Sequence, residues 1–195
     1  MRACRNLLTA AALLIATVPG LRGQEPDRNT PTAVLLSGPE VGRRAPDFTL
    51  PWASQNGVGP ADSPYQLWRD RGKAVVIAFY PRDFTSGCTN EMRTFAEQYD
   101  SLFGPDVVVV GISTDSLSTH QRFAASLGVS FRLLSDPEQK VARKYGSHDN
   151  SGFARRTVYV VGPDGRVKYR NMKFNPLDPT EYARLGAAVR AASGS

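Results

Sequence analysis

The chain has 195 residues, enough for one domain with a substantial hydrophobic core. Its 41% hydrophobic and 9% aromatic residues are typical of an ordinary soluble globular protein. The formal net charge of +6 arises without any run of lysines or arginines, so nucleic-acid binding is not expected.

Residues 1–23 have the pattern of a secretory signal peptide. A positively charged start precedes an apolar stretch, residues 7–18, that is too short to span a bilayer comfortably. A Pro-Gly-Leu-Arg-Gly sequence ends the stretch, and cleavage is expected near Gly23 or Gln24. An uncleaved membrane anchor is the alternative. We therefore expect an exported protein, periplasmic or secreted, that loses Cys4 and keeps a net charge of +3.

Residues 24–40 are polar, contain three prolines and are expected to form a flexible lead-in to one domain over 41–195. Within this domain, residues 73–80 form an apolar run typical of a strand that is buried on both faces. An amphipathic helix is expected over 89–103 and a second buried strand over 107–113. Two such strands joined by one helix indicate a parallel βαβ unit.

The second half of the domain alternates between helical and extended patterns. Asp136 is a plausible N-cap, and a Pro-Asp-Gly turn indicates an antiparallel hairpin. The sequence thus predicts an α/β fold with a mixed central sheet and helices on both faces. The expected elements are a helix at 117–127, a strand at 130–134, a helix at 137–145, a hairpin at 157–170 and a final helix from Asp178 or Thr180 to about Ala192.

Cys88 follows the first buried strand and lies at the start of the helix after it. Free backbone N–H groups and the helix dipole favour a thiolate at such a position, and the thiolate is the reactive form of cysteine. After removal of Cys4 no other cysteine remains to form a disulfide. An unpaired thiol in an oxidising compartment is a liability unless it is buried or used, which favours a functional Cys88.

The residues around Cys88 resemble the active-site motif of the peroxiredoxins. The motif is matched in full by Pro81, Thr85 and Cys88 at the spacing Pro-x-x-x-Thr-x-x-Cys. Three further segments resemble family signatures in the same order, and the closest resemblance is to the Q-type, bacterioferritin-comigratory subfamily. These segments are 45–50, 111–115 and 133–136. The resemblance implies a thioredoxin-like fold and a thiol-dependent peroxidase that needs no metal or cofactor.

The resemblance also implies roles for the residues of the motif. Cys88 is the nucleophile that attacks the peroxide, and the hydroxyl of Thr85 binds a peroxide oxygen. Backbone N–H groups near Gly87 and Cys88 donate to the substrate, and Pro81 shields the sulfur. The expected substrate is hydrogen peroxide or an organic hydroperoxide.

The resemblance further implies a distant arginine that holds Cys88 as a thiolate. Arg155 corresponds best to this residue, and Arg156 is less favoured because neighbours on an extended segment point to opposite faces. Glu91 lies one helical turn after Cys88 and is expected to orient the arginine. A solvated charge is the alternative for both Arg155 and Glu91.

The main departure from the family pattern concerns the reduction of Cys88 back to the thiol after it has been oxidised. Many Q-type members carry a resolving cysteine five residues after the nucleophile, where this chain has Arg93. We therefore expect a one-cysteine cycle in which an external thiol, a thioredoxin-like protein or a low-molecular-weight thiol, reduces a Cys88 sulfenic acid. Peroxiredoxins often form homodimers, although no pattern here selects an interface.

Other interpretations have less support. A disulfide oxidoreductase of this fold class requires Cys-x-x-Cys, but position 85 is threonine. A metal site requires ligands beyond Cys88, and His120 and His148 are both expected at the surface. Two further alternatives keep the fold: a non-enzymatic thiol module, which is a peroxide sensor or mixed-disulfide partner, and a structural relic with an inert Cys88.

Overall fold

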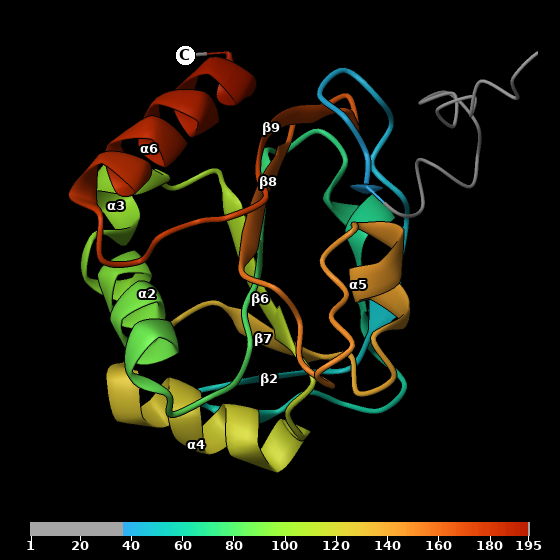
Figure 1. The fold of residues 1–195 in the computed structure, drawn as a ribbon, viewed down its shortest axis with the longest axis vertical. Coiled ribbons are helices and arrows are strands. Elements are labelled where there is room, and N and C mark those ends of the chain that lie inside the picture. The colour runs from blue at the N-terminus through green and yellow to red at the C-terminus, as the bar shows by residue number, and fades with distance from the viewer. Residues whose placement is uncertain (1–36, 195) are drawn as a thin grey trace, which may run out of the picture.

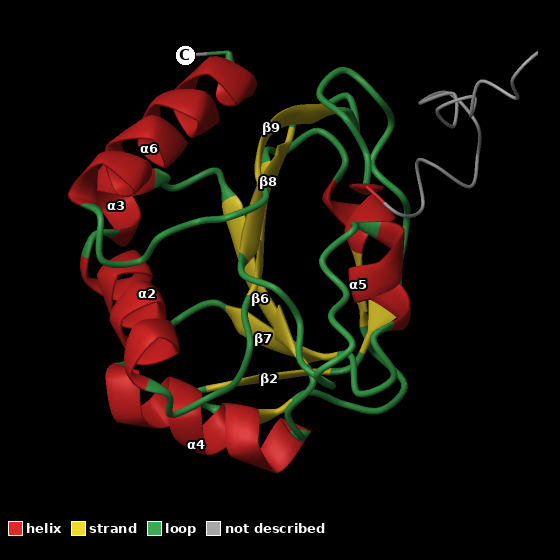
Figure 2. Ribbon diagram, in the orientation of Figure 1, coloured by secondary structure: helices red, strands yellow, loops and turns green. Residues whose placement is uncertain are grey.

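The computed structural model describes residues 37–194 and is built on a central seven-stranded sheet (Figures 1 and 2). The strand order is β3-β2-β7-β6-β5-β8-β9, in which β5, β6 and β7 are parallel and the outer pairs are antiparallel. The strands are β2 (Trp52–Ser54), β3 (Gly57–Val58), β5 (Val75–Phe79), β6 (Val108–Ser113), β7 (Arg132–Ser135), β8 (Thr157–Val161) and β9 (Val167–Asn171). The predicted mixed sheet is confirmed.

Helices cover both faces of this sheet, as predicted. Figure 1 shows α2, α3, α4 and α6 on one side and α5 on the other. The helices are α2 (Ser86–Glu97), α3 (Tyr99–Leu102), α4 (Leu117–Leu127), α5 (Lys140–Lys144) and α6 (Pro179–Ser193). A two-stranded sheet of β1 (Thr49–Leu50) and β4 (Tyr65–Gln66) leads into the 3₁₀-helix η1 (Leu67–Asp70). Within residues 37–194, no helix is long and apolar enough to cross a membrane.

The central strands divide the interior into two cores because their side chains alternate between the faces of the sheet. Every residue of β5 and of β8 is buried, which explains their uninterrupted apolar sequences. Val76, Val158 and Val160 belong to the core under α2 and α6, whereas Ile77 and Tyr159 belong to the core under α5. Cys88 lies in the first of these cores.

Several boundaries differ from the predicted ones. The helix predicted over 89–103 begins at Ser86 and is interrupted at Gln98, which separates α2 from α3. The predicted helix over 137–145 is shortened to α5, because Gln139 has a left-handed backbone, yet the carboxylate of Asp136 still accepts from the N–H groups of Val141 and Ala142.

Only a short part of the predicted N-terminal segments lies within the described residues. The predicted signal peptide, residues 1–23, and most of the lead-in fall outside the described residues. Gly38 and Pro39 are buried, so the packed domain begins before residue 41.

Candidate active site

Cys88 is the third residue of α2, beyond the carboxyl end of β5. Its side chain is completely buried, and it is the one free cysteine in the part of the chain that the structure describes. The first N–H groups of a helix have no acceptor within the helix, so those of Ser86, Gly87 and Cys88 are available to an anion. The sulfur therefore lies in a setting that favours its thiolate.

Arg156 is the cation at this sulfur. Its Nη2 lies 3.2 Å from Cys88 Sγ, and its Nη1 donates to Glu91 Oε2 in an ion pair. Arg156 is 16% exposed at its side chain and Glu91 is fully buried. The guanidinium thus links the helix residue Glu91 to the thiol, and the expectation that Glu91 pairs with an arginine is confirmed in its geometry.

Arg155, the residue expected at this place, does not contact Cys88, and that prediction is wrong. Its Nε donates to His148 O at 2.8 Å, and its side chain is exposed. The physical reason is the alternation along β8: Arg156 shares a face with Val158 and Val160, which pack under α2. The sequence predicted that Arg155 and Arg156 point to opposite faces, but it assigned the face toward Cys88 to the wrong one of the two.

Burial and ion pairing have opposite effects on the charges of Glu91 and Arg156. Burial raises the pKa of Glu91 to about 7, although Arg156 favours its charged form. Burial also disfavours the charge of Arg156, but Glu91 and Cys88 together raise its pKa above the ordinary value. Glu91 Oε1 is buried without a hydrogen-bond partner. Arg156 remains a cation, and Glu91 is the group that titrates near neutral pH.

The other predicted residues surround the sulfur. Thr85 is the N-cap residue of α2, and its hydroxyl donates to Arg82 O at 3.0 Å, which leaves its lone pairs free to accept from a peroxide O–H. A Cβ on Gly87 would lie 3.2 Å from Arg156 Nη2, so glycine allows the guanidinium to approach closely. Pro81 is half-buried and lines the groove beside Arg156.

This groove has a volume of about 450 Å³ and carries both cationic and apolar groups. Arg82 lies over the ring of Phe153 at 4.7 Å, at the groove's edge. The lining residues are Pro81, Asp149, Ser151, Phe153, Ala154, Arg155, Arg156, Met172, Lys173 and Phe174. Arg156 therefore connects an open, positively charged groove to the buried sulfur.

His120 was predicted at the surface, and that prediction is wrong. The imidazole is completely buried against Asp83, with Nδ1 2.8 Å from Asp83 Oδ2. The residues beside His120 in the sequence are polar, which suggested a surface position. His120 nevertheless lies three residues before the buried Phe123, on the same face of α4. His148 is half-buried in the loop before β8. Among residues 37–194, no three His, Cys, Asp or Glu side chains gather in a way that could hold a metal ion.

Comparison with known proteins finds relatives of this chain among the peroxiredoxins. The sequence model of the AhpC/TSA family matches residues 41–170. The putative peroxiredoxin bcp of Coxiella burnetii is 37% identical over 137 residues, which cover 66% of this chain and 85% of that protein. The chloroplastic peroxiredoxin Q of Triticum aestivum is 32% identical over 170 residues, which cover 86% and 72%.

Solved structures show the same fold. Peroxidoxin BcpB of Mycobacterium tuberculosis superposes with a TM-score of 0.66 at 28% identity, covering 78% of this chain and 97% of that one. AhpC of Enterococcus faecalis has a TM-score of 0.69 at 23% identity, covering 80% and 93%, and this similarity concerns the fold alone.

Proposed function

Because the chain belongs to the AhpC/TSA family, and within it to the Q-type peroxiredoxins, we propose that it is a thiol-dependent peroxidase that acts through Cys88. The observation that carries this proposal is the contact of 3.2 Å between Arg156 Nη2 and Cys88 Sγ at the first turn of α2. A cation and free helix N–H groups at one sulfur favour the nucleophilic thiolate. The proposed substrate is hydrogen peroxide or an organic hydroperoxide.

The reaction requires little of the protein besides charge and position. The thiolate attacks one peroxide oxygen, the O–O bond breaks, and the second oxygen leaves with a proton as water or an alcohol. Cys88 then carries that first oxygen as a sulfenic acid. Thr85 accepts from the peroxide O–H, and the N–H groups of α2 and Arg156 stabilise the negative charge that moves to the leaving oxygen.

Recycling is proposed to use an external thiol. Arg93 lies where many Q-type members carry a resolving cysteine, and Cys88 is the one cysteine among residues 37–194. A first thiol would condense with the sulfenic acid to give a mixed disulfide and water. A second would then release Cys88 as the thiol and leave as a disulfide. A thioredoxin-like protein and a low-molecular-weight thiol are the two classes of reductant to test.

The test is a turnover assay with the purified protein, hydrogen peroxide and either thioredoxin with its reductase or glutathione. We expect repeated consumption of peroxide by wild type and by Cys4→Ser, and none above background by Cys88→Ser. Equal consumption by wild type and Cys88→Ser would overturn the proposal.

A non-enzymatic thiol module is the second candidate. It is favoured by one observation, the complete burial of Cys88, which restricts access of a large reductant to the oxidised sulfur. The same assay separates the two: a sensor would consume one equivalent of peroxide and stop with each reductant. Multiple turnovers with either reductant would exclude it.

We also propose that the chain is exported and that residues 1–23 are removed. The support is the charged, apolar and small-residue pattern of that segment. A homodimer, which the resemblance to the family suggests, is a separate proposal. N-terminal sequencing of the protein from a periplasmic or secreted fraction tests cleavage, and sedimentation of the purified protein tests the dimer.

A further inference from the structure

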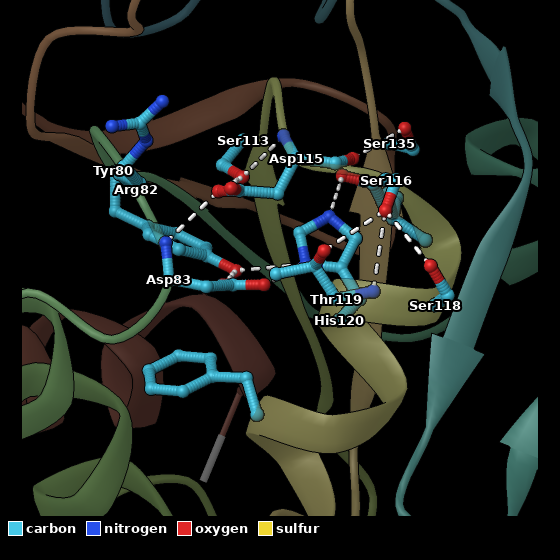
Figure 3. Close-up of polar contacts among 12 residues, drawn as sticks. Tyr80, Arg82, Asp83, Ser113, Asp115, Ser116, Ser118, Thr119, His120 and Ser135 are labelled. Atoms are coloured by element: carbon cyan, nitrogen blue, oxygen red, sulfur yellow. Dashed lines mark hydrogen bonds and ion pairs between the residues drawn. The ribbon is translucent and has the colours of Figure 1, made fainter.

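A buried polar cluster lies at the carboxyl ends of β5, β6 and β7, beside the loop that leads to Cys88 (Figure 3). Its centre consists of Tyr80, Asp83 and His120, whose side chains point toward one another and are at most 3% exposed as residues. Burial of a carboxyl group and an imidazole is costly unless their polar atoms are paired. Nothing in the proposed reaction uses this cluster directly.

The hydrogen bonds of the cluster require one shared proton. His120 Nε2 lies 3.1 Å from Leu134 O, and because a carbonyl only accepts, Nε2 carries a hydrogen. His120 Nδ1 lies 2.8 Å from Asp83 Oδ2, so a proton lies between them, on either the imidazole or the carboxyl group. Tyr80 donates to Asp83 Oδ1 at 2.7 Å. Burial first and then Asp83 raise the pKa of Tyr80 well above its ordinary value, so it stays a neutral donor.

Asp83 is also held through its backbone. Its N–H donates to Asp115 Oδ2 at 2.9 Å, and the hydroxyl of Ser113 donates to the same oxygen at 2.7 Å. The hydroxyl of Ser135 donates to Asp115 O at 2.6 Å. Asp83 is thus attached to α4 through its side chain and, through its N–H, to Asp115 just after β6 (Figure 3).

The residue after Asp83 has an unfavourable backbone. Phe84 has φ +60°, in the left-handed region that a bulky side chain rarely adopts. The residue is 53% exposed, and its ring centroid lies 5.0 Å from that of Phe123. Such strain persists only where the surroundings fix the backbone, and it is common at active sites. The next residue, Thr85, is the N-cap residue of α2. The fixed Asp83 therefore determines where Thr85 and the first turn of α2 lie.

We propose that Asp83 and His120 are positioning residues. Their hydrogen bond, which contains one shared proton and is called the clamp below, holds loop 81–85 so that Thr85 and the first turn of α2 receive the peroxide. This inference rests on the proposed peroxidase function, and it concerns the placement of the substrate rather than the reactivity of the sulfur. Loss of the clamp lets Phe84 relax and moves Thr85, while Arg156 still faces Cys88.

The test compares two reactions of the same thiolate in the full chain. Hydrogen peroxide needs the positioned loop, whereas iodoacetamide needs only a reactive sulfur, so the ratio of the two second-order rate constants cancels changes in thiolate fraction. We expect His120→Leu and Asp83→Leu to lower this ratio about tenfold or more. Tyr80→Phe, which removes one donor and keeps the ring, lowers it about threefold. His148→Leu is the matched control and leaves it unchanged.

Asp83→Asn distinguishes positioning from packing. Its carbonyl oxygen can accept from Tyr80, and its amide can donate to the free Nδ1 of a neutral His120, so all three hydrogen bonds are retained. We expect the ratio of Asp83→Asn to stay near that of wild type. Equal losses in Asp83→Asn and Asp83→Leu, or an unchanged ratio in His120→Leu, would overturn the clamp.

Tyr80→Phe decides the question if the leucine variants do not fold, since an unchanged ratio in that variant also overturns the proposal. The wild-type protein separates this failure from a failure of the proposed function. A wild-type Cys88 that reacts with peroxide no faster than free cysteine would contradict the peroxidase. A fast wild type with unchanged variants would contradict only the clamp.

Discussion

At Cys88, the positive charge of Arg156 is divided between two anionic groups. The guanidinium contacts both Cys88 Sγ and Glu91 Oε2, so the charged form of Glu91 reduces the benefit that Arg156 gives to the thiolate. In return, Glu91 fixes the orientation of a long side chain that would otherwise have many rotamers. Glu91 therefore fixes the position of the Arg156 guanidinium but weakens the stabilisation that Arg156 gives to the thiolate.

Arg156→Gln should lower the second-order rate constant of Cys88 with hydrogen peroxide by about 100-fold, because a charged donor at the reacting sulfur is lost. Arg155→Gln is the matched control, since its side chain contacts His148 O and not the sulfur. Rapid mixing followed by acid quench and mass spectrometry measures both rates. A large loss in Arg155→Gln, with Arg156→Gln near wild type, would restore the original assignment.

Glu91→Gln should remove a pH dependence of stability. Burial raises the pKa of Glu91 from 4.5 to about 7, so the folded state binds this proton more tightly than the unfolded chain. The contribution of Glu91 to folding is therefore fully present below about pH 4.5 and is lost as the pH rises through about 7. A tenfold change in proton affinity is worth about 1.4 kcal/mol, so the loss is at most between about 3 and 4 kcal/mol.

Urea denaturation at several pH values measures this effect. The free energy of unfolding of Glu91→Gln minus that of wild type should rise between about pH 5 and 8. Glu97→Gln, which changes an exposed carboxyl on the same helix, should follow wild type throughout. Parallel curves for wild type and Glu91→Gln would show that Glu91 titrates as it does in the unfolded chain.

The sequence predicted the position of Cys88 and of its acidic neighbour Glu91, but not the arginine that contacts the sulfur. Cys88 and Glu91 follow from a motif and a helical spacing, which are local. Arg155 and Arg156 differ only in the face to which they point, and all five residues of β8 are buried, so its burial pattern contains no information about the face. His120 was missed for a related reason, because its buried partner Asp83 is distant in the sequence.

At the scale of the element, the start of α2 combines three functions within residues 85–88. Thr85 occupies the N-cap position, Gly87 allows Arg156 to approach, and Cys88 provides the sulfur. The helix was predicted to begin at Thr89, but it begins at Ser86 and thereby brings the N–H groups of its first turn to Cys88.

Gly87→Ala should separate activity from stability. Alanine is the better helix former by up to about 1 kcal/mol, so the free energy of unfolding should stay equal or rise. The added Cβ would lie 3.2 Å from Arg156 Nη2 and displace the guanidinium from the sulfur. We expect the peroxide rate constant to fall about threefold to tenfold. Thermal unfolding and the peroxide rate, measured on the same sample, test this pairing.

The opposite pattern would contradict the role assigned to Gly87. A variant with lower stability and an unchanged peroxide rate constant would show that Arg156 accommodates the Cβ without moving from Cys88. Ser86→Ala is the matched control, since Ser86 is the exposed residue one position earlier in the same turn.

Long elements with a helical period were easier to predict than short strands. The helix over 117–127 is confirmed to the residue, and it ends at Gly128, which has φ +66°. β2 and β3 were not predicted, because strands of two or three residues have no measurable period. They form the edge beyond β7, and β7 and β6 separate them from β5, so their omission did not affect the site.

At the scale of the whole molecule, the parallel order of β5, β6 and β7 brings the site together. Their carboxyl ends lie at one edge of the sheet, where the loop before α2 meets Asp115 and α4. The antiparallel β8 adds Arg156 to the same edge, because Thr157 is paired with Phe79 at the end of β5. The βαβ pattern predicted the parallel pair, whereas the pairing of β8 with β5 depends on contacts between distant segments.

The burial of Cys88 and the absence of a second cysteine among residues 37–194 together predict the fate of the oxidised protein. Without a thiol reductant, the sulfenic acid has no partner within this part of the chain, so further peroxide should convert it to the sulfinic acid.

Intact-mass measurement of Cys4→Ser after excess peroxide should show the addition of two oxygen atoms. A non-reducing gel should show no disulfide-linked dimer, because two buried sulfurs cannot meet without displacing α2 or its loop. Glutathione present from the start should suppress the addition of the second oxygen. A disulfide-linked dimer as the main product would show that the sulfur becomes exposed on oxidation and that a second copy acts as the resolving partner.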